Sequence, residues 1–150
     1  MGTSYIDGTI ESAALKRKRR NIAIFDHIRF KLADGSNRTV GKSVAAGEIA
    51  DRLQPGASGR FYLYTSIDHK GVHGVRDGQG KAVYGFPTTN ETLMLVVVGI
   101  NLAWLIAAVT LGGVIPILPT LLVVLGIPAW FLYRKTRLET RRQFDADNGA

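Results

Sequence analysis

Hydrophobic residues are unevenly distributed along the chain, and the longest apolar segment, residues 92–133, contains no charged side chain. The hydrocarbon core of a bilayer is about 30 Å thick, so roughly 20 helical residues cross it once, and this segment is long enough for two crossings. Gly112 and Gly113 lie in its middle, where a helix is expected to stop and the chain to turn. The pattern predicts a transmembrane helical hairpin over 88–133, with helices over about 89–111 and 116–133.

The two predicted helices have different start signals. Thr88 and Glu91 have the spacing of a capping box, in which each side chain bonds a backbone N–H of the first helical turn. Pro116 suits a first helical turn, whereas Pro119 would remove a backbone hydrogen bond if the helix had already begun. A second helix that starts only at Pro119 is short for a full crossing and must tilt or thin the bilayer.

Small residues recur four positions apart in the first predicted helix, at Gly99, Ala103 and Ala107. Such a stripe lets another helix approach closely. We expect this helix-packing stripe to contact the second helix of the same chain, in preference to a second copy in a homo-oligomer. Asn101 is the strongly polar side chain of this helix, and we expect it to form a hydrogen bond between the helices.

Cations follow the apolar segment directly. They are Arg134, Lys135, Arg137, Arg141 and Arg142. The predicted turn at Gly113 has neither Lys nor Arg beside it, so the positive-inside rule predicts an integral protein of the inner or plasma membrane with both termini in the cytoplasm. Residues 134–150 are then a basic cytoplasmic tail. The second helix can continue into it as far as Arg142, and we expect its end, 145–150, to be disordered.

Residues 1–87 have the alternating pattern of a small β domain. Strands are expected over 4–15, 21–32, 37–45, 59–68 and 82–86, with a short helix over 47–53. In the clearest strand, alternation places Ile24 and Phe30 on the inner face and Phe25 on the outer face. Asp26 interrupts the apolar face, as a bulge or a bend in the strand would.

The predicted elements run in the order three strands, a short helix and two further strands. This order resembles that of an oligonucleotide/oligosaccharide-binding (OB) fold. The resemblance covers residues 4–86 and rests on the order of elements, not on a diagnostic motif. An SH3-like barrel or another small β-roll has a similar order of elements and stays an alternative. The predicted fold class is β plus transmembrane α: a cytoplasmic small β-barrel domain over 1–87, OB-like with five strands, followed by the helical hairpin.

Composition narrows the chemistry. The chain has no cysteine, which excludes a disulfide framework, a thiolate metal site and a cysteine nucleophile. His69 and His73 are four residues apart, but Gly71 and Gly74 argue against the helix that would align two imidazoles, so we expect solvated loop histidines and no metal site. No serine or carboxylate pair has the setting of a catalytic group. We therefore expect no enzyme activity, no catalytic residue and no cofactor.

The net charge is +7, and the strongest local concentration of charge is a run of five consecutive cations. The run is Lys16, Arg17, Lys18, Arg19 and Arg20. Like charges repel one another, so we expect a solvent-exposed loop after the first strand. On an anionic lipid leaflet each cation contributes about 1 kcal/mol, which would hold the barrel against the membrane. The alternatives are binding to the phosphates of nucleic acid and a solvated run without a partner.

The OB-like arrangement adds two features to the nucleic-acid alternative. The loops after the first strand and between the fourth and fifth strands flank the usual binding face, and the second of these is expected over 69–81. Its cations are Lys70, Arg76 and Lys81. Phe25, Tyr62 and Tyr64 are expected on the outer face, as stacking platforms for bases, as half-buried strand residues or as a contact face for a protein.

These features predict a non-enzymatic membrane-anchored adaptor or accessory subunit. The hairpin holds it in the bilayer, the basic loop orients the barrel on an anionic leaflet, and another protein is the expected partner. The alternative is a membrane-anchored OB-like module that binds single-stranded nucleic acid.

Overall fold

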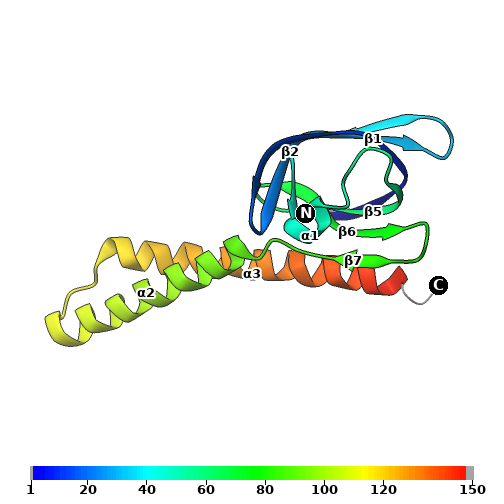
Figure 1. Ribbon diagram of the computed structural model, residues 1–150. Helices are drawn as coiled ribbons and strands as arrows, with labels where there is room; N and C mark the ends of the chain where they lie inside the picture. The colour runs from blue at the N-terminus through cyan, green and yellow to red at the C-terminus, as the bar shows by residue number, and fades with distance from the viewer. Residues whose placement is uncertain (1, 148–150) are drawn as a thin grey trace. The chain divides into compact units, whose positions relative to one another are not determined.

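The amino-terminal part of the chain is a closed β-barrel in the computed structural model, which describes residues 2–147 (Figure 1). Its elements are β1 (Gly2–Arg19), β2 (Ile22–Leu32), β3 (Asn37–Val40), β4 (Ser43–Ala46), α1 (Gly47–Ala50), β5 (Ser58–Thr65), β6 (Lys70–Asp77) and β7 (Ala82–Tyr84). The strands follow the order β1-β5-β6-β4-β2-β3, and β1 also pairs with β2, which closes the sheet on itself.

Five strands make the barrel proper. β3 and β4 both pair with β2 and together act as its third strand, whereas β7 is a short addition that pairs with β6. β4 runs parallel to β6, and α1 lies between the third and fourth barrel strands. The predicted small barrel, with a short helix between its third and fourth strands, is confirmed.

Alternate residues of the strands fill the barrel interior. The most fully buried of them include Ile6, Ile10, Ile28, Phe30, Phe61 and Val72, each at most 2 % exposed. The rings of Phe30 and Phe61 lie 5.0 Å apart, and Ile49 of α1 belongs to the same apolar cluster. Burial of these side chains is the main driving force for closing the barrel.

Two glycines let β1 and β5 approach their neighbours closely. At Gly8, where β1 pairs with both β5 and β2, a Cβ would lie 2.3 Å from the carbonyl oxygen of Lys31. At Gly59, φ is +151° and a Cβ would lie 2.1 Å from the carbonyl oxygen of Arg76. Neither position has room for a side chain, so the tight coiling of the barrel depends on glycine there.

The inner face of β2 changes at Asp26. The pairing of β1 with β2 passes over Asp26, so the predicted bulge is confirmed. The predicted orientation of the first half of the strand is wrong: Phe25 points into the barrel with Phe30, and Ile24 lies half-buried on the outer face. The extra residue shifts the alternation by one position, which moves every side chain before it to the other face.

Two segments predicted as loops are strands. β1 continues through the basic run to Arg19, and the turn to β2 consists of Arg20 and Asn21. The segment predicted as a loop over 69–81 forms β6 and the turn to β7, and the connection between β5 and β6 is 66–69. Cross-strand hydrogen bonding with β2 and β5 explains both differences, since it is independent of charge and glycine content along the sequence.

Two long apolar helices follow, α2 (Thr89–Gly112) and α3 (Ile117–Ala146), and both are long and apolar enough to cross a membrane. α2 is capped at its carboxyl end by Gly113, which adopts a left-handed conformation and donates its N–H to the Val109 carbonyl at 3.2 Å, as the predicted turn requires. The capping box is wrong, because Thr88 makes no side-chain capping hydrogen bond.

α3 begins at Ile117, so Pro119 lies in the first turn, where its missing N–H interrupts no helical hydrogen bond. The helix continues past the predicted end at 133, and its last part belongs to the barrel: the chain divides into one unit of Met1–Pro87 with Thr136–Ala150 and a second unit of Thr88–Lys135. The predicted separate tail over 134–150 is therefore helical up to Ala146, while 148–150 lie outside the described residues.

The two helices of the second unit pack through a face different from the predicted stripe. A Cβ on Gly126 of α3 would lie 2.6 Å from Cγ2 of Val98 on α2, whereas a Cβ on Gly99 would meet nothing within 4 Å. The stripe residues Gly99, Ala103 and Ala107 are all exposed. Packing of the stripe against α3 is therefore wrong, and Asn101 donates to the Val97 carbonyl of its own helix at 2.8 Å instead of to α3.

Candidate functional site

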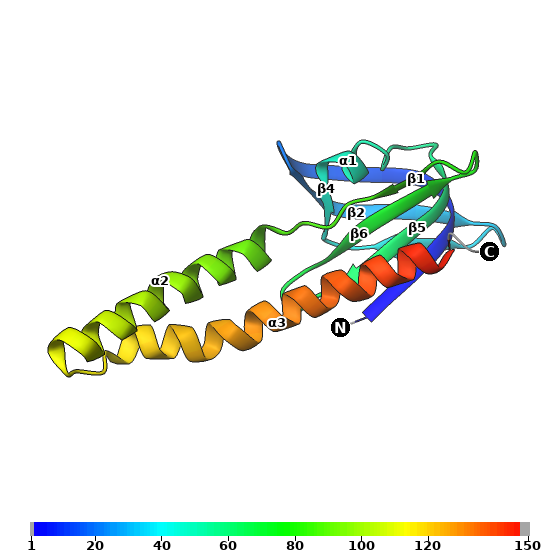
Figure 2. The same cartoon turned by 90° about the horizontal axis from the view of Figure 1, so that it is seen from below.

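The end of α3 covers the outer surface of β5, β6 and β7, which we call the docking face (Figure 2). It is formed by Tyr62, His73, Gly74 and Tyr84. Phe144 of α3 is central, since its ring lies 5.1 Å from the ring of Tyr62 and 5.4 Å from the ring of Tyr84. Gly74 provides the space, because a Cβ there would lie 2.6 Å from the Phe144 ring. This aromatic contact attaches α3 to the barrel.

Polar groups fix the same helix end. The Asp147 carboxylate accepts hydrogen bonds from the Tyr62 hydroxyl at 2.6 Å and from Nη1 of Arg60 at 3.0 Å. These two donors lower the pKa of Asp147, so the carboxylate stays charged at neutral pH. About two helical turns before Asp147, Thr140 Oγ1 lies 3.1 Å from the Tyr84 hydroxyl.

His73 is the buried basic group of the docking face. It is fully buried on β6, and its Nε2 lies 3.2 Å from Oε1 of Gln143 on α3, so the neutral imidazole donates to the amide. The rings of Tyr62, Tyr64 and Tyr84 surround it at 5.8 to 6.0 Å. Burial lowers the pKa of His73 to about 4, because an imidazolium would lose its hydration there. His73 is therefore neutral at physiological pH.

The predicted outer aromatic residues are closed to ligands. Phe25 is 3 % exposed inside the barrel, and Tyr62 and Tyr64 are 0 % and 1 % exposed. Tyr62 lies under α3, and the ring of Tyr64 lies 4.8 Å from the ring of Phe86, in the segment after β7. Their predicted roles as stacking platforms or a contact face are wrong, because segments distant in the sequence cover them.

Sequence reasoning missed the docking residues of α3. Thr136, Thr140 and Phe144 recur four positions apart and are all buried, which is the spacing of one helix face. The signal is present in the sequence, but the cations between these residues favour the interpretation as a solvated tail. The docking face and its helix are thus a structural site that joins the barrel to the chain beyond the apolar hairpin.

The cations of the basic run have different surroundings. Nζ of Lys16 lies 3.0 Å from Oδ1 of Asp26, and Lys18 forms an ion pair with Asp51. The arginines of the run, Arg17, Arg19 and Arg20, are exposed and have no ion pair among residues 2–147. The run therefore contains two lysines in exposed ion pairs and three exposed arginines without an ion pair among the described residues.

The other predicted cations do not lie on one loop. Lys70 is the first residue of β6, Arg76 is near the other end of that strand, and Lys81 follows the turn before β7. The guanidinium of Arg76 lies 5.8 Å from the centre of the Phe144 ring, so it adjoins the docking face.

The two candidate histidines also differ. His69 lies in the β5–β6 connection, with Nδ1 2.6 Å from the carboxylate of Asp68, while His73 is buried under α3. The expectation of solvated loop histidines is therefore wrong for His73, because the segment is a covered strand. Within the part of the chain that the structure describes, no group of three His, Asp or Glu side chains is placed to hold a metal ion.

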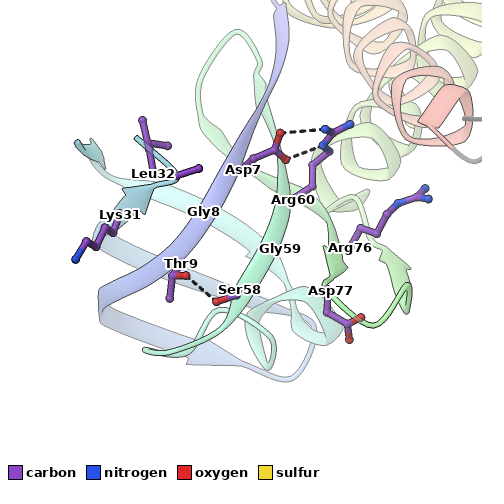
Figure 3. A pocket seen from close by; sticks show the side chains of 12 residues that line it. Asp7, Gly8, Thr9, Lys31, Leu32, Ser58, Gly59, Arg60, Arg76 and Asp77 are labelled. Carbon is purple, nitrogen blue, oxygen red and sulfur yellow. Dashed lines mark hydrogen bonds and ion pairs between the residues drawn. The ribbon is translucent and has the colours of Figure 1, made fainter. Parts of the chain in front are cut away.

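An open groove of about 610 Å³ lies along β1 and β5 (Figure 3). Four of its polar side chains are paired across the two strands: Arg60 holds Asp7 with Nε–Oδ1 and Nη2–Oδ2 distances of 2.7 and 2.9 Å. Thr9 and Ser58 share a hydrogen bond of 2.6 Å between their hydroxyls. Strand pairing accounts for these four side chains, and Lys31, Arg76 and Asp77 complete the polar lining.

The arrangement as a whole is a small β-barrel joined to two apolar helices, and it is compatible with a membrane-anchored barrel module. No protein-family model, no curated protein and no solved structure matches the chain. Its function is therefore argued from its own residues.

Proposed function

We propose that this protein is a non-enzymatic membrane-anchored barrel module that serves as an adaptor or accessory subunit of another membrane-associated protein. The apolar hairpin acts as the anchor, since both helices are long enough to span the hydrocarbon core. The barrel is the part that another protein contacts at the cytoplasmic surface.

The observation that carries the proposal is that the barrel unit holds both chain segments flanking the hairpin. Tyr84 lies shortly before α2, and its hydroxyl is 3.1 Å from Thr140 Oγ1 and 3.4 Å from the Arg137 carbonyl oxygen. Thr140 and Arg137 follow the apolar part of α3. The barrel unit therefore holds the chain on both sides of the hairpin, which suits a module that the hairpin anchors.

Orientation is part of the proposal. The cations that follow the apolar part of α3, with none in the turn at Gly113, favour cytoplasmic termini. The basic end of the β1–β2 hairpin would then meet the leaflet that carries anionic lipid, and would orient the barrel on it.

Single-cysteine variants test anchoring and orientation together, because the chain has no cysteine of its own. Ile115→Cys lies in the turn between the helices and Ser36→Cys in the turn after β2. An impermeant maleimide added to intact cells should label the first and not the second, and the protein should resist carbonate extraction. Labelling of Ser36→Cys from outside, or release by carbonate, would overturn the proposed topology or the anchor.

The accessory role requires a stoichiometric protein partner. Blue-native electrophoresis of the full chain from its own membranes should show a complex larger than the protein in detergent, with the same second component in repeated preparations. Migration as the isolated chain contradicts the accessory role, and purification with a stoichiometric metal or cofactor contradicts the non-enzymatic role.

A further inference from the structure

Cross-strand pairing divides the basic run into two sets of cations. Lys16 is at a bulge in the pairing with β2 and forms an exposed ion pair with Asp26, and Lys18 forms one with Asp51. The arginines between and after these lysines have no ion pair among the described residues. The exposed cations of the run that carry no such competing carboxylate are therefore Arg17, Arg19 and Arg20.

Two of these arginines stand beside an aliphatic strip. Arg17 is opposite Ile24, and Arg19 is opposite Ile22. Residues directly opposite each other on antiparallel strands project from the same face, so these guanidinium groups share the outer face with the two isoleucines. The next strand continues the strip, since Val44 and Ala46 of β4 are opposite Ile24 and Ile22. Its four members, Ile22, Ile24, Val44 and Ala46, are all half-buried.

This surface lies next to the segment that leads into the first apolar helix. A Cβ on Gly85 would be 3.0 Å from the Cβ of Ala46, and Gly85 lines one groove of about 430 Å³ together with Arg20. α2 begins at Thr89, and a residue of extended chain spans at most about 3.6 Å, so Gly85 stays within roughly 15 Å of the start of the helix. Chain connectivity thus keeps the arginines near the membrane surface if α2 crosses the bilayer.

We propose that Arg17, Arg19 and Arg20, with the aliphatic strip beside them, form a platform that binds the phosphates of anionic lipid headgroups, and that Lys16 and Lys18 take no part. The inference rests on the proposed membrane anchoring and adds the contact surface. Guanidinium groups suit phosphate because they bind it through two parallel N–H donors, and the isoleucines suit the boundary between headgroups and acyl chains. A contact surface made of arginine and aliphatic side chains matches a lipid surface in both respects.

The test uses the full chain in nanodiscs of neutral lipid alone or with anionic lipid. A fluorophore on Asn21→Cys, in the turn between β1 and β2, reports proximity to a headgroup spin label by quenching. A second fluorophore on Gln79→Cys, in the turn between β6 and β7, is the control position. Carbonate extraction of each variant is measured in parallel, so that loss of the anchor is seen separately.

We expect strong quenching at Asn21→Cys only with anionic lipid. Three cations near such a surface change the docking equilibrium on the order of 100-fold, so the added triple variant R17Q/R19Q/R20Q should abolish the quenching. The matched variant K16Q/K18Q should keep it. Equal quenching in neutral and anionic nanodiscs, or an equal loss of quenching in the two variants, overturns the platform. If the protein still resists carbonate extraction in that case, the proposed anchor is not affected.

Nucleic acid is examined in the same nanodiscs. Arginine-dependent binding of a short single-stranded oligonucleotide at physiological salt, without lipid-dependent quenching, would assign the surface to nucleic acid and overturn the lipid platform. Carbonate release of the unmodified chain would overturn the anchor and the platform together.

Discussion

The barrel unit and the hairpin unit differ in where they place their hydrophobic side chains. The barrel buries them, inside the sheet and under the end of α3. α2 has no buried residue, and Ile100, Trp104 and Leu111 are 64 %, 56 % and 89 % exposed. A helix that is apolar on all sides is stable in hydrocarbon and not in water. The exposed apolar surface of α2 is compatible with hydrocarbon as its surroundings, whereas the barrel keeps its apolar side chains away from water.

α3 contains both situations in one helix. Before Lys135 it exposes large apolar side chains such as Leu125 and Phe131, whereas after it Phe144 is buried and Arg142 is exposed. The helical backbone is continuous, so the two parts differ in their side chains: the first part has no charged residue up to Tyr133, whereas the part that covers the barrel has charged residues between its buried positions. Three kinds of change test this difference: removal of the helix end that covers the barrel, protonation of the groups beneath it, and disruption of the contact between the two apolar helices.

Removal of residues 136–150 should have the largest effect. The docking face would lose its cover and expose Tyr62, Tyr84 and His73 to water, while the hairpin stays intact. We expect a loss of stability larger than the 3–5 kcal/mol or so that deletion of one buried phenylalanine side chain costs. Limited proteolysis in detergent should degrade the barrel and spare the hairpin. A chain that ends after Asp147 is the control, and an equally resistant barrel in both would contradict the role of the helix end.

Phe144→Ala should destabilise the barrel unit by about 3–4 kcal/mol, because the ring fills the space above Gly74 and a cavity would remain. Arg142→Ala, an exposed change on the same helix, should stay within about 0.5 kcal/mol. Urea unfolding followed by tyrosine near-UV circular dichroism measures both. Similar midpoints for the two variants would show that Phe144 does not hold the helix.

Acidification should weaken the barrel unit between about pH 6.5 and pH 4. The unfolded chain protonates His73 near pH 6.5, whereas burial lowers the folded pKa to about 4. Within this window the unfolded state binds more protons, so the free energy of unfolding falls as the pH falls, by at most about 3 kcal/mol. Because the pKa of Asp147 is lowered, protonation of this carboxylate weakens the barrel unit only at a pH below the usual carboxyl range.

Urea midpoints at pH 7.5, 6 and 5 measure this dependence. His73→Gln keeps a side-chain donor near Gln143 but does not titrate, so its stability should change much less over the same range. An identical slope in both proteins would assign the pH dependence to other groups.

The smallest effect is expected in the hairpin. Gly126→Leu should push α3 away from Val98 and lower the stability of the helix pair by about 1–3 kcal/mol, because even a Cβ at this position would lie 2.6 Å from the valine methyl. Gly99→Leu is the matched control, since that position is open. Disulfide cross-linking between cysteines placed on α2 and α3 should fall for the first variant only. An equal loss of cross-linking in the Gly126→Leu and Gly99→Leu variants would indicate that the small-residue stripe is part of the packing face.

Several features follow from the sequence by itself because they depend on neighbouring residues. The uncharged length of residues 92–133 predicts two crossings, and glycine at 112 and 113 predicts the turn between them. Alternation over short segments predicts the strands, and Asp26 within an apolar face predicts the bulge. These properties are local, since they reflect helix length, strand period and the conformational freedom of single residues.

Tertiary structure decided which surfaces remain free, because that depends on residues far apart in the sequence. Tyr62 is covered by Phe144 and Asp147, and Lys18 forms an ion pair with Asp51, although none of these partners is near in the sequence. Charge and aromaticity along the chain identify side chains that are able to bind a ligand. Closure of the barrel and docking of α3 use the aromatic residues internally and leave the arginines of the basic run exposed, because burial is favourable for aromatic rings and costly for unpaired charges.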